Sequence, residues 1–433
     1  MAHRLSNVPS SRFSVSPPLS ALFCLLTVEL FNPEIAPRRY SLEASTGSSK
    51  QIRILCLGGD LNGGGAERVQ LDLLRRMDRE RFAIRLAYLR QSGDLQVLVP
   101  QDIEPQYLSR GPSRGRLNAV GAFRKLYALA RDADLVFAMQ ECTPAYLSVL
   151  VAKLQRKPMI GWIHVAISSA MSNYDSWHRY VGPVLYRRAS RLVGVSQGVT
   201  QDLHASYAVE VDRLSTIYNP VDIIGVRSQA DHPLLPPCAG WFAKPSILGA
   251  GRFVKQKRFD LLIRAFAQEV NRGADIHLIL LGKGPERQSL EVLAKDTGVS
   301  GRVFFAGFQM NPYPFIKAAT ALASSSDYEG LGMVLLESMA IGTPVISTDC
   351  PSGPREILED GRHGILTPIG DWKSLGSAIG RMLSCDEERK QFISRALRRV
   401  EDFGTERQTK RWEELLMDVM RTHKDAVGLV GTD

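Results

Sequence analysis

The chain has 433 residues, of which 44% are hydrophobic and 23% charged, which excludes a disordered or fibrous protein and suits two globular domains. Its net charge of +9 is uneven: residues 51–220 hold 22 Lys and Arg against 15 Asp and Glu, whereas residues 221–433 hold 27 of each. A basic first half can attract anionic lipid or phosphorylated substrates. No nucleic-acid-binding motif or aromatic interleaving accompanies the charge, so we expect no nucleic-acid partner.

Residues 1–50 are rich in Ser and Pro and show no clear hydrophobic period, so we predict a disordered extension. Their most apolar stretch, residues 19–31, is too short to span a bilayer and contains Glu29, and no small-residue cleavage site follows closely. The six cysteines form no CxxC pair and no Cys/His spacing typical of zinc. They indicate reduced thiols, and we expect a cytoplasmic location.

Short apolar runs alternate with helical patterns from residue 51 onward. Strands are predicted at residues 51–60, 82–89, 134–139, 158–164 and 191–196. Helices are predicted at residues 118–131 and 144–155, over the stretch with Val69, Leu71, Leu73 and Leu74, and after the strand at 191–196. This alternation predicts a parallel sheet covered on both faces. An Asn-Pro pair within residues 216–222, followed by the Pro- and Gly-containing stretch 223–245, predicts a domain boundary.

The same pattern restarts after residue 245. Strands are predicted at residues 246–253, 276–282, 302–308, 321–326, 344–349 and 364–370, and helices at 260–270, 331–341 and over most of 372–423. We therefore predict two Rossmann-like doubly wound α/β domains that face a cleft, over residues 51–220 and 221–405. A C-terminal helix at 406–423 and a tail at 424–433 complete the expected organisation.

Residues 324–347 join a strand to a helix through a turn that carries Glu329 and Gly330, and Glu337 lies within the helix. A helix start at this place presents free N–H groups to the edge where open parallel sheets bind ligands. A diphosphate would be stabilised there, whereas carboxylates suit sugar and ribose hydroxyls. The segment therefore predicts a ligand with hydroxyls on both sides of a phosphate, and a nucleotide sugar fits this description.

Other segments follow strands on the same side of the expected cleft. Arg252 and Lys257 can neutralise a diphosphate as it leaves. The Gly-rich residues 58–68 allow close approach to a ligand, but they lack the GxGxxG pattern and disfavour a dinucleotide site. His164 ends a strand and is equally compatible with a ligand contact and a structural role. The basic amphipathic stretch 114–131 could touch anionic membrane, but a surface helix packed on its own sheet is the preferred interpretation.

Three motifs together resemble the GT-B enzymes of retaining glycosyltransferase family 4, and the resemblance covers roughly residues 53–420. They are GAGRFVKQK at residues 249–257, EGLGMVLLE at 329–337 and GTPVISTDCPSGPREIL at 342–358. The third motif resembles bacterial enzymes that build surface polysaccharides, lipid-linked oligosaccharides or protein glycans. The resemblance implies a configuration-retaining hexosyl- or N-acetylhexosaminyltransferase with a nucleotide-sugar donor, by implication UDP-linked. It also implies that the C-terminal helix crosses back to the first domain.

The resemblance implies a role for each candidate residue. Arg252 and Lys257 would hold the donor diphosphate, Glu329 would contact the donor sugar, and Glu337 would hold the ribose hydroxyls. His164 would lie near the donor sugar and the reacting carbon. The implied donor-binding positions also include Gly64 and Gly65 from the first domain, Gly282, Gly307 and Phe308 near the base, and Gly330, Leu331, Gly332, Met333 and Val334 at the phosphate.

The first domain would bind the acceptor, a glycan or a lipid-linked glycan, through loops at residues 109–115 and 168–180. Its basic charge is compatible with peripheral contact at the inner face of an anionic cell membrane. No nucleophile for a two-step route is evident, so front-face transfer is expected. No metal-ligand cluster is evident either, so we expect no cofactor and no essential divalent ion. The alternatives are a GT-B nucleotide-sugar 2-epimerase and an inactive glycan-binding scaffold.

Overall fold

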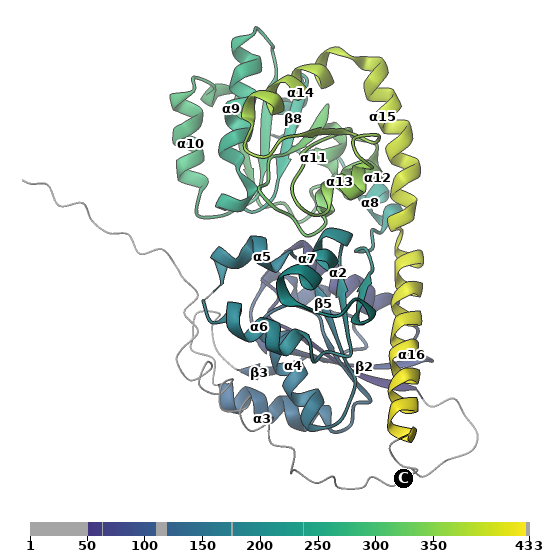
Figure 1. Cartoon of the computed structure of the whole chain (residues 1–433). Coiled ribbons are helices and arrows are strands. Elements are labelled where there is room, and N and C mark those ends of the chain that lie inside the picture. The colour runs from purple at the N-terminus through teal and green to yellow at the C-terminus, as the bar shows by residue number, and fades with distance from the viewer. Residues whose placement is uncertain (1–50, 63, 110–118, 175, 237, 430–433) are drawn as a thin grey trace, which may run out of the picture.

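The computed structural model describes residues 51–62, 64–109, 119–174, 176–236 and 238–429. The predicted extension over residues 1–50, most of the expected acceptor loop at 109–115 and the last residues of the tail, 430–433, lie outside this part of the chain. Two parallel sheets flanked by helices form two Rossmann-like domains, which Figure 1 shows one above the other. The predicted fold class is therefore confirmed.

The first domain is built on a sheet whose described strands run in the order β3-β2-β1-β4-β5-β6-β7, all of them parallel. These strands are β1 (Ile52–Gly58), β2 (Phe82–Arg90), β3 (Gln106–Ser109), β4 (Leu135–Ala138), β5 (Met159–Ile163), β6 (Arg191–Gly194) and β7 (Leu214–Thr216). Its helices are α2 (Gly65–Arg76), α3 (Ala119–Ala130), α4 (Thr143–Leu154), α5 (Ile167–Ala170), α6 (His178–Tyr186) and α7 (Gln197–Tyr207). Four consecutive residues of β1, from Ile54 to Leu57, are almost fully buried because helices cover both faces of the sheet.

The second domain repeats this design with a parallel sheet in the order β10-β9-β8-β11-β12-β13. Its strands are β8 (Ser246–Ala250), β9 (His277–Leu281), β10 (Val303–Gly307), β11 (Ala321–Ser324), β12 (Val345–Thr348) and β13 (Ile365–Thr367). Its helices are α8 (Ile223–Ala230), α9 (Phe259–Asn271), α10 (Arg287–Asp296), α11 (Tyr313–Ala318), α12 (Met333–Ile341), α13 (Pro354–Leu358), α14 (Trp372–Ser384) and α15 (Asp386–Arg399).

The chain enters the second domain near Val221 and returns near Gly404. The Val221 N–H donates to the Phe403 carbonyl at 2.9 Å, and Val221 forms an isolated bridge with Gly404. Helix α16 (Thr405–Leu429) then runs beside the first domain, in line with α15 along one side of the molecule (Figure 1). The C-terminal helix thus lies where the resemblance implied.

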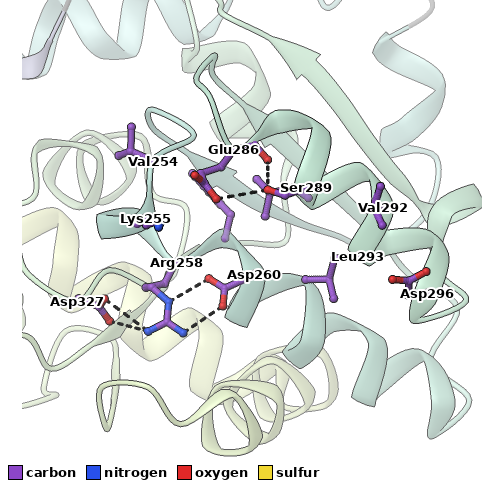
Figure 2. A pocket seen from close by; sticks show the side chains of 12 residues that line it. Val254, Lys255, Arg258, Asp260, Glu286, Ser289, Val292, Leu293, Asp296 and Asp327 are labelled. Carbon is purple, nitrogen blue, oxygen red and sulfur yellow. Dashed lines mark hydrogen bonds and ion pairs between the residues drawn. The ribbon is translucent and has the colours of Figure 1, made fainter. Parts of the chain in front are cut away.

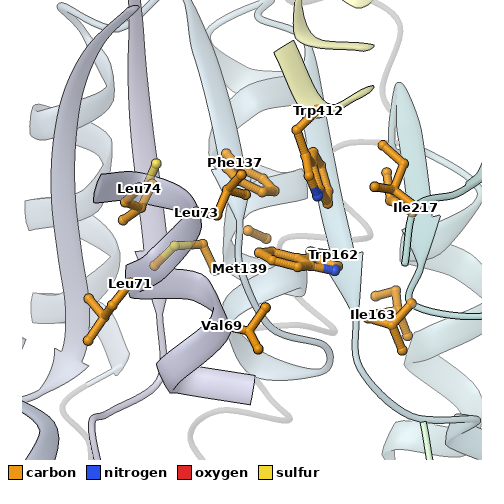
Figure 3. Close-up of a cluster of buried hydrophobic side chains, with 14 of the residues drawn as sticks. Val69, Leu71, Leu73, Leu74, Phe137, Met139, Trp162, Ile163, Ile217 and Trp412 are labelled. Atoms are coloured by element: carbon orange, nitrogen blue, oxygen red, sulfur yellow. The ribbon is translucent and has the colours of Figure 1, made fainter. Parts of the chain in front are cut away.

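A buried tryptophan fixes α16 to the first domain. Trp412 is fully buried, and its ring lies 4.7 Å from that of Trp162 on β5 and 5.1 Å from that of Phe137 on β4 (Figure 3). Glu413, the next residue, accepts hydrogen bonds from the Asp78 N–H at 2.9 Å and from Arg81 at 3.0 Å. An aromatic anchor and a neighbouring carboxylate therefore set the position of this helix.

Two local predictions differ from the structure. Residues 223–230 form α8, although their surroundings predicted an irregular linker; Asp222 caps this helix by accepting from the Gly225 N–H at 3.1 Å. Helix α12 begins at Met333, later than expected, because Gly332 adopts a φ of +98° that no helical residue has. Glu337 therefore lies about one turn into α12.

Candidate active site

The turn after β11, residues 325–332, is called the Glu329 turn below. Glu329 is only 8% exposed, and its Oε1 accepts hydrogen bonds from Lys257 Nζ and from Ser326 Oγ, both at 2.6 Å. Lys257 belongs to the loop after β8, the neighbouring strand in the sheet. The parallel topology thus brings a cation and a carboxylate 72 residues apart to one edge of the sheet.

Arg252 and Lys257 occupy different positions in the loop after β8. Lys257 is held by Glu329, whereas Arg252 is exposed and forms no ion pair with any described carboxylate. Arg258 pairs with Asp260 at 3.0 Å and with Asp327 at 3.1 Å. It therefore ties this loop to the Glu329 turn, whereas Arg252 is exposed and available to an anionic ligand.

Gly330, Leu331, Gly332, Met333 and Val334 form the end of the Glu329 turn and the first residues of α12. No side chain of the described residues caps this helix start, so its first N–H groups are available to bind an anion. The first domain approaches from the opposite side, because a Cβ added to Gly65 would lie 3.7 Å from Met333 Cγ. Gly64 precedes Gly65 as the N-cap of α2, so both predicted glycines lie near the start of α12.

Glu337 on α12 lies in a partly buried polar group. Tyr313 donates its hydroxyl hydrogen to Glu337 Oε1 at 3.3 Å, and the guanidinium of Arg68 on α2 lies close enough to act on it electrostatically. Burial raises the pKa of Glu337 above its ordinary value, while Arg68 and Tyr313 act in the opposite direction. A carboxylate held in this way can accept hydrogen bonds from a ligand diol.

The strand ends of β9 and β10 meet at Gly282 and Gly307, where the Gly282 N–H donates to the Gly307 carbonyl at 2.8 Å. Gly282 has no room for a side chain, since a Cβ would lie 1.9 Å from the Gly251 carbonyl oxygen. Phe308 is 41% exposed, and Lys283 Nζ lies 5.0 Å from the centre of its ring. An exposed aromatic ring between two glycine turns is a suitable surface for stacking a flat base.

His164 follows β5 and contacts the Glu329 turn through its backbone, because a Cβ on Gly330 would lie 1.8 Å from the His164 carbonyl oxygen. Its Nε2 lies 3.0 Å from the Met139 carbonyl, which also accepts from Gln70 Nε2 at 2.6 Å. Gln70 Nε2 also lies 3.2 Å from His164 Nε2, so the tautomer is assigned from the shorter contact to the Met139 carbonyl, with the proton on Nε2. Nδ1 is then a buried acceptor with no partner among the described residues. Burial lowers the pKa of His164 to about 3, so the imidazole is neutral and cannot act as an acid near pH 7.

A surface pocket of about 610 Å³ lies beside this site but is not part of it (Figure 2). It opens between α9 and α10 and is lined by Lys255, Arg258 and Asp327 among others, but not by Lys257 or Glu329. The glycine turns, the α12 start and Arg252 are likewise absent from its lining. We therefore locate the candidate site by its converging groups and not by the size of this pocket.

Several residues of the site were not identified from the sequence. Ser326, Tyr313, Arg68 and Gln70 all contact predicted residues or act on them, as described above. Ser326 could have been found, because it ends a predicted strand and precedes Glu329 by three residues. The other three come from elements distant in the sequence, and no local pattern indicates them.

Two further findings concern the described residues only. They contain no group of three or more His, Cys, Asp or Glu side chains arranged to hold a metal ion. None of their helices is both long enough and apolar enough to cross a membrane.

Two parallel α/β domains, with an unblocked helix start and two cations at the edge between them, define the GT-B class of enzymes. The protein of Anabaena named HepE, solved with UDP and glucose, has this fold: its TM-score is 0.72 at 22% identity, over 85% of this chain and all of that one. Two family models match the chain, "Glycosyltransferase Family 4" over residues 63–223 and "Glycosyl transferases group 1" over residues 243–399. The chain belongs to the family 4 glycosyltransferases, as its motifs predicted.

Two curated relatives are bacterial. One is the N-acetylgalactosamine-N,N'-diacetylbacillosaminyl-diphospho-undecaprenol 4-alpha-N-acetylgalactosaminyltransferase of Campylobacter jejuni, 27% identical over 79% of this chain and 93% of the relative. The other is the lipopolysaccharide core biosynthesis glycosyltransferase LpsE of Rhizobium meliloti, 42% identical over 35% of this chain. This second match covers only 43% of LpsE, so the similarity is limited to one part of each protein.

Proposed function

We propose that the protein transfers a hexosyl or N-acetylhexosaminyl group from a UDP-sugar to a hydroxyl of a glycan or lipid-linked acceptor, with retention of configuration. The observation that carries this proposal is the Lys257–Glu329 pair at 2.6 Å, beside the free N–H groups at the start of α12. A carboxylate that is neutralised by its own cation can accept hydrogen bonds from sugar hydroxyls without repelling the neighbouring diphosphate. The Lys257–Glu329 pair therefore suits a sugar joined to a diphosphate better than a lysine or a glutamate alone would.

Each residue then has a defined task in the proposed reaction. Arg252, Lys257 and the amides of residues 330–334 would stabilise the departing diphosphate. Glu329 and the neutral His164 would accept hydrogen bonds from hydroxyls of the donor sugar. Glu337 would bind the ribose diol and Phe308 would stack on the base.

The proposed transfer is a front-face substitution. The bond between the anomeric carbon and the diphosphate oxygen breaks as the acceptor oxygen bonds to the same face of that carbon. The acceptor proton passes to the leaving phosphate oxygen, so no protein base is required. Because Arg252 and Lys257 supply the positive charge, we propose that no divalent ion is essential; loss of activity on chelation, restored by a single metal, would contradict this.

Relatives support the kind of donor and acceptor. HepE was solved with UDP-glucose as well as with UDP, and the name of the Campylobacter relative specifies an undecaprenol-linked acceptor and an alpha linkage. The name of LpsE places it in lipopolysaccharide core biosynthesis. A lipid-linked acceptor would bring the enzyme to the membrane surface, and the basic first domain is the side that we propose faces it.

The test is thermal unfolding with a panel of UDP- and GDP-sugars, because a ligand of the folded state raises its stability. We expect one UDP-sugar to raise the melting temperature and to be used in transfer to lipid extract or glycan.

Glu329→Gln should lower kcat about 100-fold or more, as expected when a transition-state contact is lost. An epimer formed from the donor alone would indicate a 2-epimerase. Unchanged cellular glycan assembly in this variant would indicate a scaffold.

A further inference from the structure

The N-terminus of α7, in the first domain, contacts two parts of the second domain, the Glu329 turn and helix α13. Ser196, the N-cap residue of α7, accepts from the Val199 N–H at 3.2 Å and donates its own hydroxyl hydrogen to the Gly330 carbonyl at 2.7 Å. Both Ser196 and this hydrogen bond are buried. The first domain therefore holds a carbonyl of the Glu329 turn through a single serine hydroxyl.

The next two residues of α7 bind a carboxylate of the second domain. Glu356 on α13 accepts from the Gln197 N–H at 2.7 Å and from the Gly198 N–H at 2.9 Å. These are backbone donors that the helix itself cannot satisfy, and the positive end of the helix dipole attracts the carboxylate further. Glu356 thus closes the end of a helix that belongs to the other domain.

Tyr218 adds a third hydrogen bond to this carboxylate. Its hydroxyl lies 3.2 Å from Glu356 Oε2, and burial, followed by the nearby Glu356 charge, raises the pKa of Tyr218 to about 12. The phenol is therefore protonated at neutral pH and donates to Glu356. Its ring lies 5.0 Å from that of Phe403, whose carbonyl binds Val221 where the chain crosses between the domains.

The contact is tight and leads directly to the Glu329 turn. A Cβ on Gly198 would lie 2.6 Å from Ser352 Cβ, so α7 approaches the loop before α13 as closely as a glycine allows. Ser352 in turn donates to the Glu329 carbonyl at 2.5 Å. The α7 end therefore supports the Glu329 turn at two carbonyls, directly through Ser196 and indirectly through Ser352.

We propose that Glu356 is a positioning residue: by binding the end of α7 it holds the two domains together in the arrangement that shapes the phosphate-binding backbone of the Glu329 turn. The Glu356 carboxylate binds Gln197, Gly198 and Tyr218, and in this proposal it acts on the donor site through Ser196, Ser352 and Gly330. The inference rests on the proposed donor site for its effect on nucleotide binding, but the contact between the domains stands on its own geometry. Separation of the domains would break the Glu356 and Ser196 bonds together.

The test compares Glu356→Gln with Glu359→Gln in the full chain. Glu359 lies three residues further on, and its partners Arg362, His363 and Arg399 all belong to the second domain. We expect Glu356→Gln to increase the radius of gyration in X-ray scattering without nucleotide, and to weaken UDP binding about tenfold, a usual size for coupling between sites. Glu359→Gln should change neither quantity.

Kinetics separate positioning from a loss of folded enzyme. Saturating donor should restore closure, so the donor KM of Glu356→Gln should rise while kcat stays within about twofold of wild type. Tyr218→Phe, which removes one of the three bonds and no charge, should produce a smaller change of the same kind and serves as the test should Glu356→Gln misfold. Equal scattering and equal UDP affinity in a folded Glu356→Gln protein would overturn the inference. If wild type does not bind UDP, the proposed donor is wrong, and scattering alone decides the inference.

Discussion

At the scale of single residues, Lys257 and Glu329 depend on each other. Their side chains are 20% and 10% exposed, so removal of the cation leaves a nearly buried carboxylate with Ser326 as its remaining described partner. We expect Lys257→Ala to lower the free energy of unfolding by about 1–3 kcal/mol, the usual cost of an unsatisfied buried polar group. Urea denaturation measures this cost. Lys255→Ala, an exposed change two residues away, is the control and should be neutral.

The raised pKa of Glu337 predicts a pH dependence of nucleotide binding. A raised pKa means that the folded protein takes up a proton at a higher pH than an ordinary glutamate with a pKa of 4.5. The ionised form accepts hydrogen bonds from both ribose hydroxyls, so affinity for UDP should decrease as the pH falls toward this pKa, already above pH 4.5. Isothermal titration calorimetry between pH 4.5 and 8 measures this decrease.

Glu337→Gln provides the comparison, because its amide does not titrate in this range. The variant should bind UDP more weakly than wild type at pH 8, with an affinity that changes little down to pH 5. A wild-type profile that is flat in the same range would contradict the assignment of Glu337 to the ribose.

Residues next to recognisable strand ends could be found from the sequence, and residues that depend on tertiary contact could not. Arg252, Lys257 and Glu329 follow apolar runs, and the parallel topology places all such positions at one edge. Arg68 and Tyr313 join Glu337 only because α2 and α11 pack near α12. His164 is likewise neutral because it is buried against Gln70 and Met139, and no spacing in the sequence indicates that these residues meet.

At the scale of elements, the contact between β5 and the Glu329 turn requires a glycine at position 330. A Cβ there would lie 1.8 Å from the His164 carbonyl oxygen, so Gly330→Ala must displace the backbone of the Glu329 turn or of His164. We expect a loss in kcat/KM of at least about tenfold, since small displacements at an active site are costly. Gly240→Ala, where nothing lies within 4 Å of the added Cβ, is the control. Normal activity in Gly330→Ala would show that this close contact is not required for activity.

Helix α16 depends on Trp412 for its attachment. Replacement by Ala removes a fully buried ring from contact with Trp162 and Phe137, and we expect a loss of about 3–5 kcal/mol in stability. Chemical denaturation followed by circular dichroism measures this loss. Met417→Ala, on the same helix with 42% of its side chain exposed, should cost less than about 1 kcal/mol. Equal effects of the two changes would contradict the anchoring role of Trp412.

Elements with an apolar run or a strong hydrophobic period were predicted well. The buried strands β1 and β5 and the amphipathic helix α9 follow from their patterns alone. The strands β3 and β7, with the sequences QYLS and LST, were missed because they contain no apolar run. Helix α8 was missed because its residues resemble a linker, and it is held by packing against α11 and α12.

At the scale of the whole molecule, the charge is asymmetric while the architecture is nearly repeated. Residues 51–220 carry a net charge of +7, from 22 basic and 15 acidic residues, and residues 221–433 carry none. In the described part of α3, Ala122, Leu126 and Ala130 are buried against the core, as expected for a packed surface helix. Arg124 and Lys125 on the same helix are exposed, so they remain available to an anionic surface.

This asymmetry predicts binding to anionic vesicles through the first domain. We expect the protein to sediment with vesicles that contain phosphatidylglycerol and not with neutral ones, and to be released at 1 M salt, where the screening length falls to about 3 Å. Each basic residue near such a surface contributes about 1 kcal/mol, so Arg124→Glu with Lys125→Glu should weaken binding at least about tenfold. Lys390→Glu with Arg395→Glu makes the same charge change at exposed positions of α15, and this control should bind as wild type does. If both double variants lose binding equally, net charge alone attracts the protein to the membrane; only a selective loss in the α3 variant orients the first domain toward a lipid-linked acceptor.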